Sequence, residues 1–330
     1  MRKVLALAVC IVAVVPGHAP AQTITWDMAN EYPATSIQGE ADQHFARVLR
    51  ERSGGRMAIA HHFDASLGFR SREMLGAIGR GAVPIGNTYM GALGDSDPVF
   101  LLPSLPFLAV TSEQAHVLFE VAKAAFEKVL AKHNQRLLYP SPWPPAGLWA
   151  VKPLAGVEAL KGLRVRTADA NGVLAFRALG ATPVQVSFSD AIPQLRSGAL
   201  DAVLSSGDGG AGARLSEVLK HFTEINYAMT MSMVTVNLDA WNGLAPDLRA
   251  VVLEAAAATG ERQWREITTR VAANYERMRA AGVTITTGLP PDYRDALKRA
   301  GQAAVDEWLK IMGPDGAAIL EAYKRRLPVR

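Results

Sequence analysis

Cysteine is almost absent from this sequence of 330 residues. The only one, Cys10, lies inside the apolar run 4–15. Lipid attachment at Cys10 is not expected, because Val9 is bulky where a lipoprotein signal needs a small residue. The rest of the chain has no thiol for a disulfide bond, a cysteine metal site or a cysteine nucleophile.

Long hydrophobic runs are also lacking. The run 4–15 is too short to span a bilayer, and no later stretch approaches the roughly 18 uninterrupted apolar residues of a membrane helix. Basic residues 2–3 precede the run and small residues end at Ala21, which is typical of a secretory signal peptide. We therefore expect residues 1–21 to be removed by cleavage after Ala21, and the mature protein to be exported and soluble.

The chain has no large excess of charge of either sign. Loss of residues 2–3 with the signal lowers the formal net charge from +4 to +2, which is too close to neutral for a protein that binds a phosphate backbone. The basic cluster at 324–326 is typical of a solvated helix end. The composition therefore argues against a nucleic-acid partner.

Alternating strand and helix patterns fill the first part of the chain. Strands are predicted at 23–28 and 57–62, around a helix that Ser36 caps. The predicted core face of that helix is Ile37, Ala41, Phe45, Val48 and Leu49. A helix at 72–79 and a strand at 83–86 continue the alternation. This order predicts an α/β fold with a largely parallel sheet.

The proline-rich segment 140–145 (PSPWPP) divides the chain. It follows a predicted helix at 112–133 and a strand at 137–139, and it reads as a stiff crossing between two lobes. A second α/β block is expected at 147–231. The helical pattern after it, 246–281, predicts either one long helix that braces both halves or two consecutive helices.

Two patterns raise enzyme or metal hypotheses. Residues 207–212 (GDGGAG) match the dinucleotide fingerprint G-x-G-x-x-G, and the alternative is a flexible turn at a helix N-terminus. The pair His61–His62 suggests a metal, but adjacent strand residues point to opposite faces. Asp95 and Asp97 read as a solvated turn. The sequence therefore predicts no catalytic residue, no metal and no cofactor, with an exported dinucleotide-dependent oxidoreductase as the alternative function.

Arg166 is the most informative residue. It lies in the predicted strand 162–166 (GLRVR), where a guanidinium suits two parallel hydrogen bonds to a carboxylate. The alternative is a surface arginine in an ordinary α/β unit. Four aromatic residues that could surround a bound acid, or else fill the core, fall at strand-to-helix junctions or in the crossing segment: Phe69, Tyr89, Trp143 and Trp149.

At this point the sequence resembles the DctP-type solute-binding proteins of TRAP transporters. The resemblance rests on GLRVR at 162–166, LGATPV at 179–184 and QLRSGALDA at 194–202, with SLG at 66–68 and LPF at 105–107. It implies a periplasmic protein of two α/β lobes, joined by a long helix, that closes on an organic acid and delivers it to a membrane permease. It also implies that Arg166 binds the ligand carboxylate.

The resemblance sets the expected lobes and the expected site. Lobe I would comprise 22–146 plus about 232–271, and lobe II 147–231 plus about 272–330. Besides Arg166 and the four aromatic residues, candidate ligand contacts are Asn30, Glu31, Ser205 and Asn226. We expect a monomer whose partners are a small organic acid and the TRAP permease subunits. A role in presenting the ligand to a sensor kinase stays open.

Several positions depart from the family pattern. Leu148-Trp149 replaces a second arginine, Ser205 replaces an amide residue, and Tyr89 replaces an acidic residue found in some members; Ala202 replaces the usual glycine. A second ligand carboxylate would be buried without a partner, which is unfavourable by several kcal/mol. These departures predict a monocarboxylate with an apolar or aromatic body.

Overall fold

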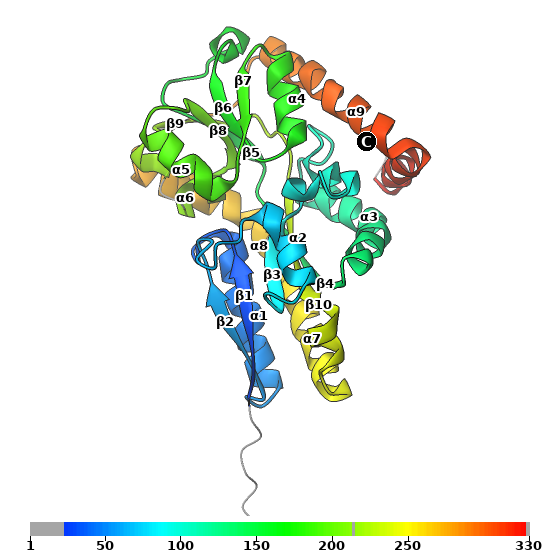
Figure 1. Ribbon diagram of the computed structural model, residues 1–330. Helices are drawn as coiled ribbons and strands as arrows, with labels where there is room; N and C mark the ends of the chain where they lie inside the picture. The colour runs from blue at the N-terminus through cyan, green and yellow to red at the C-terminus, as the bar shows by residue number, and fades with distance from the viewer. Residues whose placement is uncertain (1–22, 213–214, 328–330) are drawn as a thin grey trace, which may run out of the picture.

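The structure is a computed structural model that describes residues 23–212 and 215–327, so the expected signal peptide and its cleavage after Ala21 lie outside the described residues. The chain forms two lobes, each built around one sheet (Figure 1). Lobe I, as used below, is the part around the sheet with strand order β2-β1-β3-β10-β4. Lobe II is the part around the sheet with strand order β11-β9-β5-β8-β6-β7.

Lobe I begins with the βαβ unit that the sequence predicts. Strand β1 (Ile24–Asn30) pairs in parallel with β2 (Met57–His62) and with β3 (Ile85–Tyr89). Helix α1 (Ile37–Arg52) is capped by Ser36, whose side chain accepts from the backbone N–H of Gly39. The five residues of its predicted core face are all buried. Helix α2 (Ser71–Gly79) and helix α3 (Ser112–Lys132) complete the expected alternation.

The sheets are mixed, which corrects the expectation of a largely parallel sheet. Strand β10 (Met231–Asn237) runs antiparallel to β3 and to β4 (Gln135–Pro142). Strand β5 (Ala146–Ala150) runs antiparallel to β8 (Ala202–Ser206). Both β5 and β10 are the first strands after the chain has crossed between lobes. A strand that enters a sheet from the other lobe starts at the end of the sheet that faces that lobe. The neighbouring strands finish at that end, so the entering strand runs antiparallel to them.

The prediction that residues 140–145 form the crossing between the lobes is wrong for the first three of them, which continue strand β4. Pro140 and Pro142 belong to β4, opposite Met233 and Met231. Strand β4 lies at the edge of its sheet, where a proline without an N–H is tolerated because one side of the strand needs no ladder hydrogen bond. The crossing itself is therefore shorter than predicted.

In lobe II, strands β6 (Arg164–Thr167), β7 (Thr182–Gln185) and β8 form a parallel group. Helix α4 (Ala170–Ala178) follows β6, and α5 (Phe188–Arg196) connects β7 to β8. The short β9 (His221–Thr223) and β11 (Thr284–Thr286) complete the sheet. Glycine 207 opens α6 (Gly207–Gly212) directly after β8.

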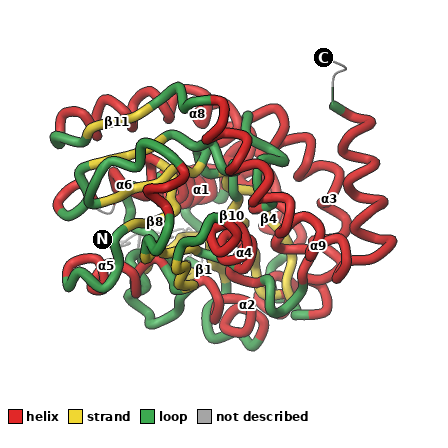
Figure 2. Tube along the Cα trace, turned by 90° about the horizontal axis from the view of Figure 1, so that it is seen from above, coloured by secondary structure: helices red, strands yellow, loops and turns green. Residues whose placement is uncertain are grey.

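Two long helices join the lobes. Helix α8 (Pro246–Ala280) is one continuous helix of 35 residues, so of the two predicted alternatives the structure has the single long helix and not two consecutive helices. It packs against α1 and β4 of lobe I and against α6 of lobe II. Helix α9 (Pro291–Arg326) contacts α4 of lobe II and α3 of lobe I, and it is kinked at Gly313 (φ +57°). Seen from above, α9 crosses over to α3 (Figure 2).

Short elements fill the rest of the described chain. These are the 3-10 helices Met90–Leu93, Pro98–Ser104 (η2), Val157–Leu160 and Leu215–Glu217, and the helix α7 (Leu238–Asn242). Among the described residues, none of the helices is long and apolar enough to cross a membrane.

Candidate functional site

Arg166 is a buried cation at the interface of the lobes. It lies on β6 and is 3% exposed. Its Nε donates to the carbonyl of Val186 at 2.9 Å, and its guanidinium carbon lies 5.7 Å from the centre of the Phe188 ring. Within residues 23–212 and 215–327, no acidic side chain forms an ion pair with it. Because a buried charge is unfavourable without a partner, the terminal nitrogens are suited to an incoming anion.

A pocket with an empty volume of about 470 Å³ adjoins this guanidinium. Both lobes contribute walls, and most of the wall is aromatic or aliphatic. Tyr32 packs edge-on against Trp143, with 4.6 Å between ring centres, and its ring is tilted by 39° against that of Phe188, with 5.5 Å between ring centres. The lining residues are Tyr32, Tyr89, Trp143, Ala146, Arg166, Ala168, Asp169, Phe188, Leu204, Ser205, Ser206, Tyr227 and Thr230.

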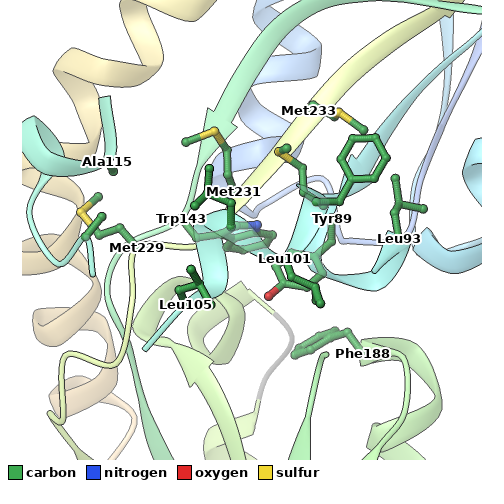
Figure 3. Close-up of a cluster of buried hydrophobic side chains, with 14 of the residues drawn as sticks. Tyr89, Leu93, Leu101, Leu105, Ala115, Trp143, Phe188, Met229, Met231 and Met233 are labelled. Carbon is green, nitrogen blue, oxygen red and sulfur yellow. The ribbon is translucent and has the colours of Figure 1, made fainter. Parts of the chain in front are cut away.

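These aromatic walls belong to a hydrophobic cluster that extends across the cleft. Figure 3 shows Tyr89 and Trp143 of lobe I in the same cluster as Phe188 of lobe II. The indole N–H of Trp143 donates to the hydroxyl of Ser232 at 3.0 Å, which fixes the plane of the ring. The cluster therefore places flat apolar surfaces beside the charged group.

Asp169 is the one acidic residue in the pocket lining. Its Oδ2 accepts a hydrogen bond from the hydroxyl of Tyr89 at 2.7 Å, and its Oδ1 accepts from the backbone N–H of Gly172 as the N-cap of α4. Burial raises the pKa of Tyr89, and the negative charge of Asp169 raises it further. Tyr89 is therefore a fixed, protonated donor that connects lobe I to lobe II.

A second cavity also adjoins Arg166 and is called the outer cavity here. It has an empty volume of about 710 Å³. It shares Tyr32, Tyr89, Arg166, Ala168 and Phe188 with the pocket. Its remaining lining residues are mostly polar: Glu31, Ser71, Arg72, Ala92, Asp95, Gln185 and Ser187.

The structure brings four of the nine predicted contacts into the pocket: Arg166, Tyr89, Trp143 and Ser205. Glu31 lines only the outer cavity. Tyr32, Phe188 and Asp169 also line the pocket and were not among the predicted contacts. For Asp169 a signal was available, because an aspartate directly after a strand and before a helix is a standard N-cap.

Trp149 does not line the pocket, which corrects its predicted place beside the ligand. It is fully buried, packs edge-on against Phe222 at 5.2 Å between ring centres, and donates from Nε1 to the carbonyl of Ser206. Side chains alternate along a strand. Ala146, three positions earlier on β5, therefore faces the pocket while Trp149 faces the opposite side of the sheet.

Phe69 and Asn226 also lie outside the pocket. Phe69 packs on the small cluster beneath α2, with the guanidinium of Arg80 over its ring at 5.8 Å. Asn226 has a positive φ of 48° and lines a separate groove with Phe107 and Leu289. Asn226 is in the second chain crossing and Phe69 follows the turn after β2, so neither side chain reaches Arg166.

Asn30 belongs to a buried polar network beneath the site. Its Nδ2 donates to Asp42, which also accepts from Asn87 and from the hydroxyl of Tyr139. The Oδ1 of Asn30 accepts from the backbone N–H of Tyr32 at 2.8 Å. Asn30 therefore positions the pocket wall and does not enter the pocket itself.

Asp42 should make stability depend on pH. Burial raises its pKa to about 7, against the three hydrogen bonds that lower it. The folded state then holds a proton that the unfolded state has lost, so stability falls as pH rises from about 4 to about 7. Because of Asp42, the free energy of unfolding measured with urea should be about 2–3 kcal/mol lower at pH 8 than at pH 5, and Asp42→Asn should remove that difference. The same dependence of the unfolding free energy on pH in both proteins would contradict this assignment.

The remaining sequence candidates have structural roles. In the segment 207–212, Asp208 is buried, accepts from the backbone N–H of Ile37 at 2.7 Å, and forms an ion pair with Arg270. Asp97 caps a 3-10 helix through Val99. In the part of the chain that the structure describes, no group of three or more histidine, cysteine, aspartate or glutamate residues is arranged to hold a metal ion.

Comparison with known proteins covers nearly the whole chain. The DctP family model, described as bacterial extracellular solute-binding protein, family 7, matches residues 28–311. A marine-metagenome TRAP solute-binding protein specific for pyroglutamate, solved with co-purified pyroglutamate, superposes with a TM-score of 0.87 at 30% identity, over 92% of this chain and 99% of that chain. Bordetella pertussis DctP6, an extracytoplasmic solute receptor binding pyroglutamic acid, gives 0.87 at 29%, over 92% and 100%.

A sequence relative from Escherichia coli (strain K12) is the 2,3-diketo-L-gulonate-binding periplasmic protein YiaO. It is 24% identical over 297 residues, which are 88% of this chain and 89% of that protein. All three matches are described as binding a small solute; the Escherichia coli relative is described as periplasmic and the Bordetella pertussis receptor as extracytoplasmic. The two solved structures share the arrangement of both lobes.

Proposed function

Because this chain belongs to the DctP family of TRAP transporter solute-binding proteins, which are receptors and not enzymes, we propose that it captures a small monocarboxylate in the pocket around Arg166. The observation that carries the proposal is a guanidinium that is 3% exposed and has no acidic partner among the described residues. Its free terminal nitrogens match the two oxygens of a carboxylate. This leaves no role for the dinucleotide fingerprint.

The pocket chemistry favours one carboxylate over two. Arg166 is the only cation among the lining residues, and the lining carboxylate of Asp169 would repel a second negative charge. Trp143, Tyr32 and Phe188 offer apolar faces to the body of the ligand. A compact acid with a largely apolar ring fits this combination, and both pyroglutamate-binding relatives support it.

Polar groups at the edge of the pocket would orient the ligand body. Ser205 and Ser206 at the end of β8 present hydroxyl groups, and Thr230 adds another from the second chain crossing. Tyr89 would close the pocket from lobe I through its hydrogen bond to Asp169. Ligand binding to both lobes would shift the protein toward the closed arrangement.

Isothermal titration tests this proposal. Pyroglutamate or a small aromatic monocarboxylate should bind at least tenfold more tightly than succinate, because burying the second carboxylate of succinate without a partner is unfavourable by more than about 1.4 kcal/mol. Pyroglutamate methyl ester is the matched control ligand, since it keeps the ring and lacks the charge; it should not bind measurably. Tighter binding of succinate than of every monocarboxylate would overturn the ligand class.

The proposal also covers the export of the receptor, its delivery of the ligand and its division into domains. The signal peptide 1–21 would direct export, and the closed, loaded receptor would deliver the acid to the membrane subunits of a TRAP permease as a monomer. The division into 22–146 plus about 232–271 and 147–231 plus about 272–330 remains our proposed domain assignment. The chain crossings after β4 and before β10 support it.

A further inference from the structure

We infer that Glu31 is a positioning residue that holds the two lobes closed, and not a contact of the ligand. It follows β1 in lobe I and is 3% exposed. Its Oε2 accepts from the backbone N–H of Ser71 at 2.8 Å. Its Oε1 accepts from the N–H and the hydroxyl of Ser189 at 3.2 and 3.3 Å. Protein donors therefore already occupy both carboxylate oxygens.

The two serines begin helices of different lobes. Ser71 is the first residue of α2 in lobe I, and Ser189 lies in the first turn of α5 in lobe II. The first N–H groups of a helix have no partner within the helix, and the helix dipole gives that end a partial positive charge. One buried carboxylate thus accepts charge-assisted hydrogen bonds from both helix ends and joins the lobes.

An ion pair joins the same two helix ends. Arg70, the N-cap of α2, donates from Nε and Nη2 to Asp190 of α5 at 2.7–3.1 Å. Hydrogen bonding to Arg70 lowers the pKa of Asp190. The two side chains are 37% and 42% exposed, so water competes for this pair and it contributes little on its own. We therefore assign the larger effect to the buried contact of Glu31.

This contact lies beside the route between the pocket and solvent. Glu31 and Ser71 line the outer cavity together with Arg166. Exposed residues of both lobes, Arg72 and Gln185, line the same cavity, which therefore reaches solvent. The start of α2 and the start of α5 both border this cavity, through Ser71 and Phe188, so separation of the two helix ends would widen the exit from Arg166. Breaking the Glu31 contact is then part of ligand release, whatever the body of the ligand.

The test is a rate measurement on Glu31→Gln. The amide places an N–H donor where an oxygen accepted, so one helix end loses its partner. We expect the dissociation rate of pyroglutamate to rise about tenfold and the association rate to stay within twofold, as measured by stopped-flow tryptophan fluorescence. Glu51→Gln is the matched control, because it makes the same change at an exposed ion pair with Arg47 on α1; both of its rates should be unchanged.

The outcomes distinguish a residue that holds the lobes together (a latch) from a residue that contacts the ligand. Loss of a latch raises the dissociation rate by the same factor for every acid that binds, whereas loss of a ligand contact changes the rate of one acid more than that of another. A rate within twofold of the wild-type value, or a strongly acid-dependent change, would overturn the inference. If Glu31→Gln does not fold, Ser189→Ala removes only the hydroxyl donor and should speed release about twofold to threefold.

The inference rests on the proposed function, and a second measurement keeps the two apart. If the wild-type protein binds none of the acids, the proposed function fails, and closure is then measured without ligand. Spin labels at Arg50→Cys on α1 and Arg177→Cys on α4, in a chain expressed without residues 1–21, report the distance between the lobes. Glu31→Gln should shift the distances to longer values than Glu51→Gln does, and identical distributions would refute the latch.

Discussion

Replacement of Arg166 with alanine is expected to weaken ligand binding by about 3 kcal/mol, or roughly 150-fold. The loss is large because the guanidinium is buried at the interface of the lobes and is the only cation in the pocket lining. A ligand carboxylate in the variant would be desolvated without any compensating charge. Stability of the ligand-free protein should not fall, since the variant removes an unpaired buried charge.

Titration calorimetry and thermal unfolding measure the two effects separately. Arg164→Ala is the matched control, because Arg164 lies two positions earlier on β6 but is 47% exposed and pairs with Asp201. Its removal should leave the dissociation constant within about threefold. If Arg166→Ala also binds within threefold of the wild-type protein, Arg166 is not the carboxylate anchor, and the proposed function loses the observation on which it depends.

The regular elements of the fold could be predicted because they are encoded locally. The apolar faces of α1 and α3, at three- and four-residue spacing, appear in the structure as buried faces. The local pattern could not decide whether 246–281 forms one helix or two, because Thr259 and Gly260 have low helix propensity. In the structure both are buried: the hydroxyl of Thr259 donates to the carbonyl of Ala255, one turn earlier in α8, and Gly260 lies beside Tyr139 of lobe I. Tertiary packing, which a local pattern does not contain, outweighs the weak propensity.

The candidate site was predictable only in part, for two physical reasons. Arg166 has a sequence signal, since it lies on a strand whose flanking motifs resemble a known family. Trp149 shows the first limit: a residue on a strand faces one side or the other according to parity, so a small error in register moves a tryptophan from the pocket to the opposite face. Gly147, on the same face as Trp149, confirms the packing there, because a Cβ at that position would lie 2.3 Å from the Phe222 ring.

The second limit is that the pocket is completed by segments that are distant in sequence. Tyr32 and Phe188 are more than 150 residues apart and belong to different lobes, yet their ring centres lie 5.5 Å apart. Neither has a local pattern that distinguishes it from a core aromatic residue. Closure of one lobe on the other places both beside Arg166, and only the arrangement in space reveals that they share a wall.

Removal of Asp208 should have the largest effect on stability, about 3–5 kcal/mol for Asp208→Ala. Its side chain is 0% exposed and accepts from the backbone N–H of Ile37, the first residue of α1. It also pairs with Arg270 of α8, which in turn binds Glu40 of α1 at 2.9 Å. The alanine variant would leave a helix end and a largely buried guanidinium without this partner, and both groups would be desolvated in the folded state only.

Urea unfolding followed by circular dichroism measures this effect, with two comparisons. Asp208→Asn keeps an oxygen for the N–H of Ile37 and loses the charge, so it should fall between wild type and alanine. Glu266→Ala breaks the Arg262–Glu266 pair of α8, whose side chains are 34% and 37% exposed, and should change stability by less than about 1 kcal/mol. A change below 1 kcal/mol for Asp208→Ala as well would mean that Glu40 and the carbonyl of Thr35 stabilise Arg270 without Asp208. Asp208 lies only three residues after Ser205, which lines the pocket. A large loss of stability would therefore show that Asp208 couples this part of the pocket wall to the start of α1.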